Sequence, residues 1–145
     1  MTPAQFSAHM TKAAAALPKR LVAAEAVTLQ EAKARAILLS SGTLSTAELR
    51  KRGHPYARRN PTSPNPQIIN AQTGVFRQAY TTPPPVPSAS GVTASVVNVA
   101  RYSGYMRGTR LMVARPLPQA VQLAVRVRRL ARTAGAIRTA FHSKG

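Results

Sequence analysis

A helical pattern dominates the first forty residues. From position 17 onward one face repeats at three- and four-residue spacing, and its members are Leu17, Leu21, Ala24, Thr28, Glu31 and Arg35. Pro18 disturbs the pattern, because a proline inside a helix removes a backbone hydrogen bond and kinks or breaks the helix. We therefore predict a main helix over 17–39 that ends at the Ser-Ser-Gly sequence of 40–42. A kinked helix over 3–39 is the alternative.

The following residues, 40–72, are polar and contain many prolines. A short helix is expected over 46–52, with Ser45 as its N-cap and Glu48 at its third position. The prolines after it exclude regular structure and are Pro55, Pro61, Pro64 and Pro66. The pattern indicates a long loop over 40–72.

Alternating and β-branched residues return in the next third of the chain. They predict strands over 75–80 and 92–99, which would pair as an antiparallel hairpin around a loop at 81–91. The expected tip of this hairpin contains Pro83, Pro84 and Pro85. With a further short strand at 110–114, the β-sheet region extends over 73–115.

The last apolar pattern is again helical. Its steps of four and three residues are Leu123, Val127, Leu130, Ala134, Ile137 and Phe141, with Arg126 and Arg129 on other faces. We predict a helix over 116–134 that starts with prolines in its first turn and ends before Gly135, followed by a basic tail over 135–145. Its apolar face is expected to pack on the sheet, since it lacks the bulky anchors of a membrane-surface helix.

Together these elements predict one domain over 1–145 of the α+β class. A long N-terminal helix and a C-terminal helix would pack on a small antiparallel β-sheet, with long extended loops between them.

Composition argues against an enzyme. The chain has 21 Lys and Arg against three acids, Glu25, Glu31 and Glu48, and it lacks Asp and Cys. Paired carboxylates, carboxylate-bound magnesium, a buried acid for a catalytic histidine and thiolate chemistry are therefore missing. The three histidines are scattered, and no glycine-rich phosphate loop is present. We expect no catalytic residue, no metal and no cofactor.

The charge is distributed unevenly. Residues 1–48 contain five cations and all three acids, whereas residues 49–145 contain sixteen cations and no acid, within a total formal charge of +18. Such a chain should bind polyanions or an acidic protein surface. The candidate interaction residues are Arg50, Lys51, Arg52, Arg58, Arg59, Pro83, Pro84, Pro85, Arg126 and Arg129. The apolar content is mostly Ala and Val, so we expect assembly to contribute to stability. No apolar run has the length of a membrane span, and we expect no membrane contact.

Three short motifs follow one another in a fixed order. They are Thr73-Gly74-Val75-Phe76-Arg77, then Val97-Asn98-Val99-Ala100-Arg101-Tyr102-Ser103-Gly104-Tyr105-Met106-Arg107-Gly108-Thr109, then Ala114-Arg115-Pro116-Leu117-Pro118-Gln119-Ala120. In order and spacing, residues 53–125 resemble the lambdoid-type head–tail joining family of tailed bacteriophages, which contains neck and tail-completion proteins. Arg107 departs from the family pattern, in which an acidic residue often precedes Gly-Thr.

This resemblance implies a non-enzymatic virion subunit, made in the host cytoplasm and built into the neck. Such subunits form six- or twelvefold rings between the portal–adaptor complex and the tail-terminator or tail-tube proteins, and packaged DNA passes through the channel. The loops at 40–72 and 81–91 would then contact neighbouring rings. The alternative from a different class is a small basic nucleic-acid-binding protein.

Overall fold

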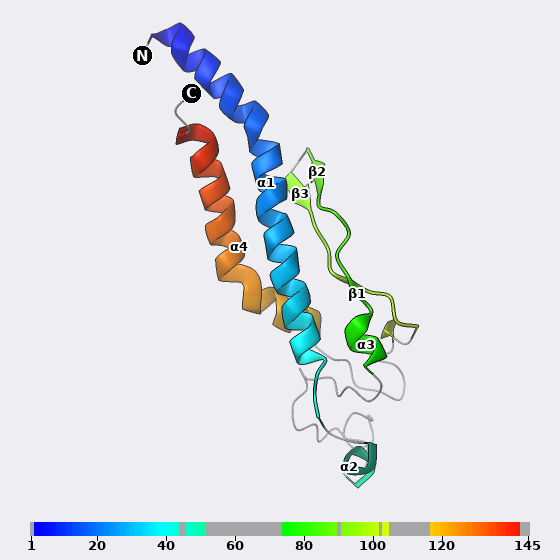
Figure 1. Cartoon of the computed structure of the whole chain (residues 1–145). Helices are drawn as coiled ribbons and strands as arrows, with labels where there is room; N and C mark the ends of the chain where they lie inside the picture. Colours follow the sequence, from blue (N-terminus) through cyan, green and yellow to red (C-terminus); the bar gives the residue numbers. More distant parts are fainter. Residues whose placement is uncertain are drawn as a thin grey trace.

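Two long antiparallel helices form the main body of the protein. The computed structural model describes residues 2–43, 46–51, 74–89, 91–101, 103–104 and 117–142. Helix α1 (Pro3–Leu39) and helix α4 (Leu117–His142) lie side by side with their outer ends close together (Figure 1). The Nε2 atom of His9 lies 2.8 Å from the carbonyl oxygen of Phe141, which ties the start of α1 to the end of α4.

Helix α1 begins fourteen residues before the predicted start. Thr2 is its N-cap, Thr2 and Gln5 form a reciprocal capping box, and Pro3 lies between them at the first helical position, where proline is tolerated. Pro18 lies inside the helix, and α1 changes direction in its N-terminal half (Figure 1). The prediction of a start at residue 17 was wrong, and the kinked helix over 3–39 is confirmed.

Helix α4 is also longer than predicted. It continues through Gly135 to His142, so the expected stop at 134 and the basic tail from 135 were wrong as far as His142. Thr139 donates a hydrogen bond from Oγ1 to the carbonyl oxygen of Gly135 at 2.8 Å, within the continuous helix. A single glycine costs a helix only about 1 kcal/mol relative to alanine, which neighbouring turns can offset.

The predicted strand at 75–80 is mostly helical. Gly74 has a φ of 77°, a left-handed conformation that favours glycine, and it is the N-cap of helix α3 (Val75–Gln78). Phe76 in this helix and Tyr80 after it are both buried. Their rings pack edge to face, with the ring centroids 5.6 Å apart. The strand prediction failed here because Val75, Phe76 and Tyr80 fit either element.

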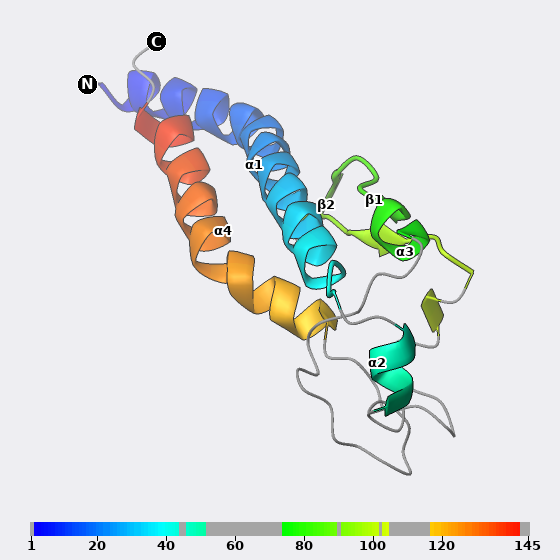
Figure 2. The ribbon, with the colours of Figure 1, turned by 60° about the horizontal axis from the view of Figure 1, so that its bottom comes forward.

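A long, thin hairpin follows α3 and lies along α1 (Figure 1), on the side of α1 away from α4 (Figure 2). Its base pairs β1 (Tyr80–Thr81) with β4 (Val97–Asn98), and its outer part pairs β2 (Val86–Ser88) with β3 (Gly91–Thr93), both antiparallel.

The two ladders of the hairpin are separated by an irregular stretch in which residues 82–85 face 94–96. The proline triplet lies in this stretch, where prolines, which cannot donate to a ladder, are tolerated. The prediction of a proline-rich tip was therefore wrong. The outer ladder instead ends at the pair of Ser88 and Gly91, and Gly91 has a φ of 140°.

Within the described part of the chain, the core lies where the inner ends of both long helices meet the base of the hairpin. Its members are Ala32, Ala36, Leu39, Phe76, Tyr80, Ala100, Leu117 and Val121. At its edge, the fully buried hydroxyl of Ser40 lies 2.9 Å from that of Tyr80. Burial raises the pKa of Tyr80, and the hydrogen bond with Ser40 partly opposes this.

This arrangement confirms the predicted α+β class, with two long helices and a small antiparallel β region. Helix α2 (Thr46–Lys51) agrees with the short helix expected at 46–52. Its expected cap Ser45, residues 52–72 of the predicted loop and the strand expected at 110–114 lie outside the described residues.

Candidate interaction surface

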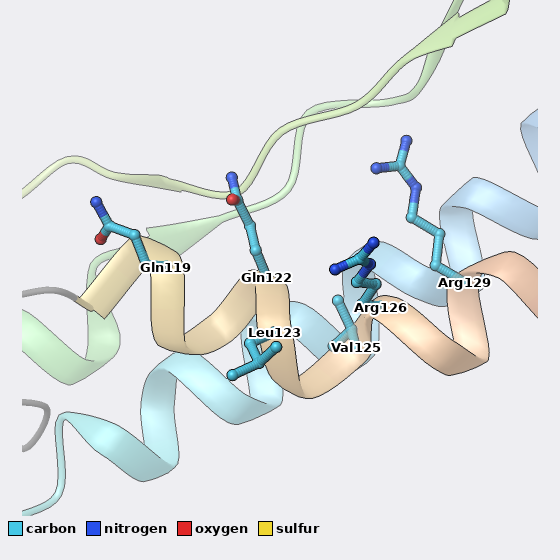
Figure 3. A pocket seen from close by; sticks show the side chains of 6 residues that line it. All are labelled: Gln119, Gln122, Leu123, Val125, Arg126 and Arg129. Atoms are coloured by element: carbon cyan, nitrogen blue, oxygen red, sulfur yellow. The ribbon is translucent and has the colours of Figure 1, made fainter.

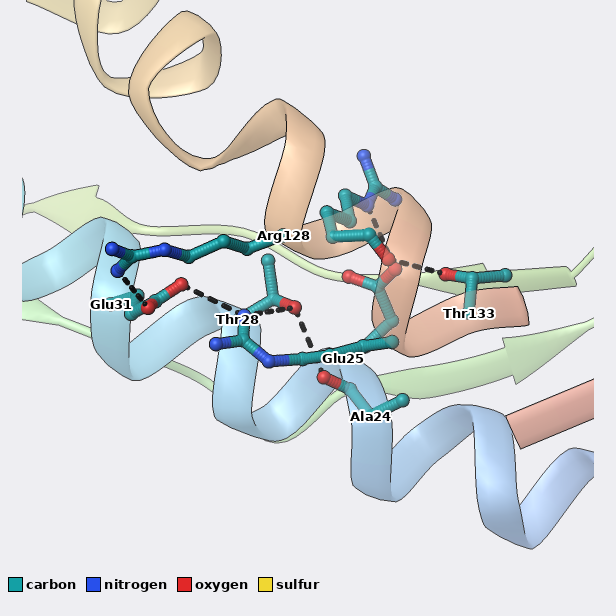
Figure 4. A network of polar contacts seen from close by, with 8 residues as sticks. Ala24, Glu25, Thr28, Glu31, Arg128 and Thr133 are labelled. Atoms are coloured by element: carbon teal, nitrogen blue, oxygen red, sulfur yellow. Dashed lines mark hydrogen bonds and ion pairs between the residues drawn. The ribbon is translucent and has the colours of Figure 1, made fainter. Parts of the chain in front are cut away.

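Arginines of α4 face α1 and pair with the two acids of that helix (Figure 4). Arg129 donates from Nε to Oε1 of Glu25 at 2.8 Å. Glu31 accepts from two arginines at once, from Arg128 at 2.7 Å and from Arg132 at 2.8 Å. Two of the chain's three acids are therefore used to hold its own helices together.

The geometry of this ion-pair cluster sets its electrostatics. Hydrogen bonds from Arg132 and then from Arg128 lower the pKa of Glu31 to about 2. The same bond to Glu31 raises the pKa of Arg132. Thr28 is buried between the acids, donates to the carbonyl oxygen of Ala24 and accepts from Arg132 at 3.3 Å. Glu31 is therefore ionised at every pH at which the protein is normally handled.

The opposite face of α4 is apolar and points to solvent. Leu123, Val127 and Leu130 are 71, 77 and 62% exposed and follow each other at four- and three-residue spacing. Ile137 continues this row at 42% exposure. We call these four residues the outer stripe. Large apolar side chains that are exposed together mark interaction sites more often than isolated ones do.

The predicted orientation of α4 was wrong, because the outer stripe faces solvent. Its apolar residues were expected to pack on the sheet, yet the hairpin packs along α1 and the arginine face of α4 turns inward. Paired charges, together with Leu117 and Val121 at the first turns, decide which face α4 presents to α1.

A shallow pocket of about 520 Å³ lies beside the outer stripe (Figure 3). It is lined by Gln119, Gln122, Leu123, Val125, Arg126 and Arg129. Its polar groups are amides and guanidiniums, which are mainly hydrogen-bond donors to an acidic or carbonyl-bearing partner.

A second hollow, of about 550 Å³, lies where α1, the hairpin tip and the end of α4 come together. Pro18 and Leu21 of α1 line it with Val92 and Phe141. It offers little polar chemistry and carries no site of its own.

The predicted interaction residues are spread over several elements. Arg126 and Arg129 line one pocket, but Arg129 is also bound to Glu25. Arg50 and Lys51 lie in α2, while Arg52, Arg58 and Arg59 lie outside the described residues. The prolines 83–85 lie in the hairpin arm, with Pro83 and Pro84 exposed.

Sequence reasoning missed the partners of the α4 arginines. Glu25, Thr28 and Glu31 follow at three-residue spacing and share one face of α1, next to the buried Ala32. That spacing was the available signal, because acids beside a buried face need cationic partners.

No protein-family model matches the sequence, and no curated protein or solved structure matches the chain. In the part of the chain that the structure describes, no group of three possible metal ligands occurs, and no helix is long and apolar enough to cross a membrane.

Proposed function

We propose that the chain is a structural assembly subunit, and that it forms a ring in the neck of a tailed bacteriophage, between the portal–adaptor complex and the tail. The observation that carries the proposal is the presence of two exposed apolar faces at different places on the subunit, besides the outer stripe of α4. Near its start helix α1 exposes Phe6 and Met10 at 55 and 38%, and farther along it exposes Val27 and Leu38 at 53 and 60%.

Two different faces on one subunit suit a ring, because each heterologous contact joins one patch to another and closes by rotation. The core points the same way, since few large side chains are buried among the residues that the structure describes, and such a subunit gains stability from its neighbours. The resemblance of residues 53–125 to head–tail joining proteins supports the placement in the neck. Packaged DNA would then pass through the channel of the ring.

The test is the mass of the purified full chain, measured by native mass spectrometry and viewed by electron microscopy at low and high salt. We expect rings, six- or twelvefold, that survive high salt because apolar burial holds them. A chain that stays monomeric at every salt and protein concentration contradicts the proposal.

The second candidate is a small basic nucleic-acid-binding protein, and the concentration of sixteen cations after residue 48 favours it. This function predicts binding to arbitrary duplex DNA that falls by several decades as salt rises. A monomer that shows this steep salt dependence would establish the second candidate in place of the first.

A further inference from the structure

The outer stripe of α4 is flanked by charge of one sign. At 3.6 residues per turn, Arg126 and Arg138 lie on opposite sides of the row, each about 60° from its centre. Both are exposed, and among the described residues neither has an ion pair. The surface is therefore an apolar row between two cations, with the donors of Gln119 and Gln122 close to its start.

A second copy of this chain does not complement that surface. Glu25 and Glu31 are engaged with α4 of their own subunit, so the only other acid that a copy brings is Glu48. Everything after residue 48 is neutral or cationic. Stripe-to-stripe contact between copies would set Arg126 and Arg138 against further arginines, and like charges across an interface disfavour it.

We propose that the outer stripe binds an acidic amphipathic helix of a different protein. Its apolar row would pack against Leu123, Val127 and Leu130, and its flanking carboxylates would meet Arg126 and Arg138. Three large side chains at helical spacing make a row one helix wide, which fits a third helix laid along the pair. The inference rests on the proposed assembly role and names the chemistry of the partner for one face.

Ring contacts between copies then use other surfaces, such as the exposed Val27 and Leu38 of α1. Ring formation and binding of an acidic helix can be disproved separately, because the first is measured as the mass of the assembly and the second as a binding affinity.

The experiment uses three synthetic helical peptides and the full-length protein, with binding followed by calorimetry. The first peptide carries leucines at i, i+4 and i+7 with glutamates beside them. The second replaces the glutamates by lysine, and the third keeps the glutamates but replaces the leucines by serine. We expect only the first to bind, and we expect its affinity to fall with added salt without vanishing.

Variants of the protein locate the site. Leu123→Ser, Val127→Ser and Leu130→Ser combined should weaken binding of the first peptide by about 100-fold or more, since three buried aliphatic contacts are lost. Arg126→Gln with Arg138→Gln should weaken it by about 3- to 30-fold. The matched control is Val86→Ser with Val99→Ser, which removes equally exposed apolar groups from the hairpin and should change nothing.

The remaining outcomes would overturn the inference. Equal binding of the serine peptide means that charge alone attracts the ligand. Binding of anionic phosphatidylglycerol vesicles that is lost in the triple serine variant assigns the stripe to a membrane surface. Rings that fall apart in the same variant without any added peptide assign it to a second copy of the chain. Circular dichroism of each variant excludes unfolding, which is not expected at exposed positions.

Discussion

Glu31 binds two arginines of α4 through one carboxylate. It accepts hydrogen bonds from two arginines of α4, and its pKa of about 2 lies below the ordinary value of 4.5. When a carboxyl group has a lower pKa in the folded protein than in the unfolded chain, the unfolded chain binds the proton first as pH falls. The stability that Glu31 contributes is therefore complete above about pH 4.5 and is lost between pH 4.5 and 2.

Replacement of this carboxylate should flatten the acid side of the stability profile. In Glu31→Gln, the free energy of unfolding should fall less steeply between pH 4.5 and 2 than in the wild type. Arg132→Gln should have a smaller effect and Arg128→Gln the smallest, because the bond from Arg132 lowers the pKa more. Urea unfolding at several pH values measures the slopes. Identical slopes in wild type and Glu31→Gln would show that the ion pairs do not couple to folding.

Replacement of two glycines by alanine should change the stability in opposite directions, because the two backbones have different conformations. Gly91 has a φ of 140° at the hairpin tip, a region closed to other residues, so Gly91→Ala should destabilise the fold by about 1–3 kcal/mol. Gly135 lies inside α4, seven residues before its last residue His142, and a Cβ there would meet nothing within 4 Å. Gly135→Ala should therefore stabilise the protein by about 0.5–1 kcal/mol. Thermal unfolding of both variants gives the signs, and a gain in Gly91→Ala would contradict the described tip.

At the scale of the element, Pro18 has the largest expected effect. A proline in a helix interior costs about 3 kcal/mol, and α1 bends without ending there. Pro18→Ala should raise stability by about 1–3 kcal/mol and increase the helical circular dichroism signal.

Pro3→Ala is the matched control for this change. Pro3 lies in the first turn, where the missing N–H group has no partner to lose, so its replacement should have little effect. Loss of stability in Pro18→Ala would mean that the bend is needed to bring His9 to the end of α4.

The elements differ in how far the sequence specifies them. Long helices follow from periodicity, and both were predicted, including the end of α1 at Leu39 and the start of α4 within one residue. The start of α1 and the end of α4 were not predicted. The Thr2–Gln5 capping box outweighs Pro18, and packing on α1 carries α4 past Gly135. Helix α3 was predicted as a strand from the β-propensity of residues such as Val75. It is a helix because burial of Phe76 beside Tyr80 overrides that propensity.

The candidate site was the least predictable part. Local spacing identified the apolar row of α4 correctly, yet the side to which that row turns depends on Glu25 and Glu31, about a hundred residues away. Only the pairing of the two helices brings these acids to the arginines. The pattern of one helix does not distinguish an apolar face that is buried in the protein's own core from an apolar face that binds another protein.

At the scale of the whole molecule, the charge is nearly all of one sign. Both acids of the helix pair are already paired with arginines, and the chain retains a formal charge of +18. Self-repulsion in the compact state should therefore oppose folding at low ionic strength. The thermal midpoint should rise by a few degrees as salt increases from about 0.01 to 0.15 M, where the Debye length falls from about 30 to 8 Å. A falling midpoint would mean that the ion pairs outweigh the repulsion.

The contact between His9 and Phe141 joins positions 132 residues apart. Helix α1 therefore leaves the ribosome well before its partner exists. About 100 residues separate Leu39 from His142, and their synthesis takes roughly 5 to 20 s. During that interval the face formed by Ala32 and Ala36 has no α4 to cover it. Any chaperone that binds the nascent chain there competes with α4 for the same surface, so release from the chaperone would time the closure of the helix pair.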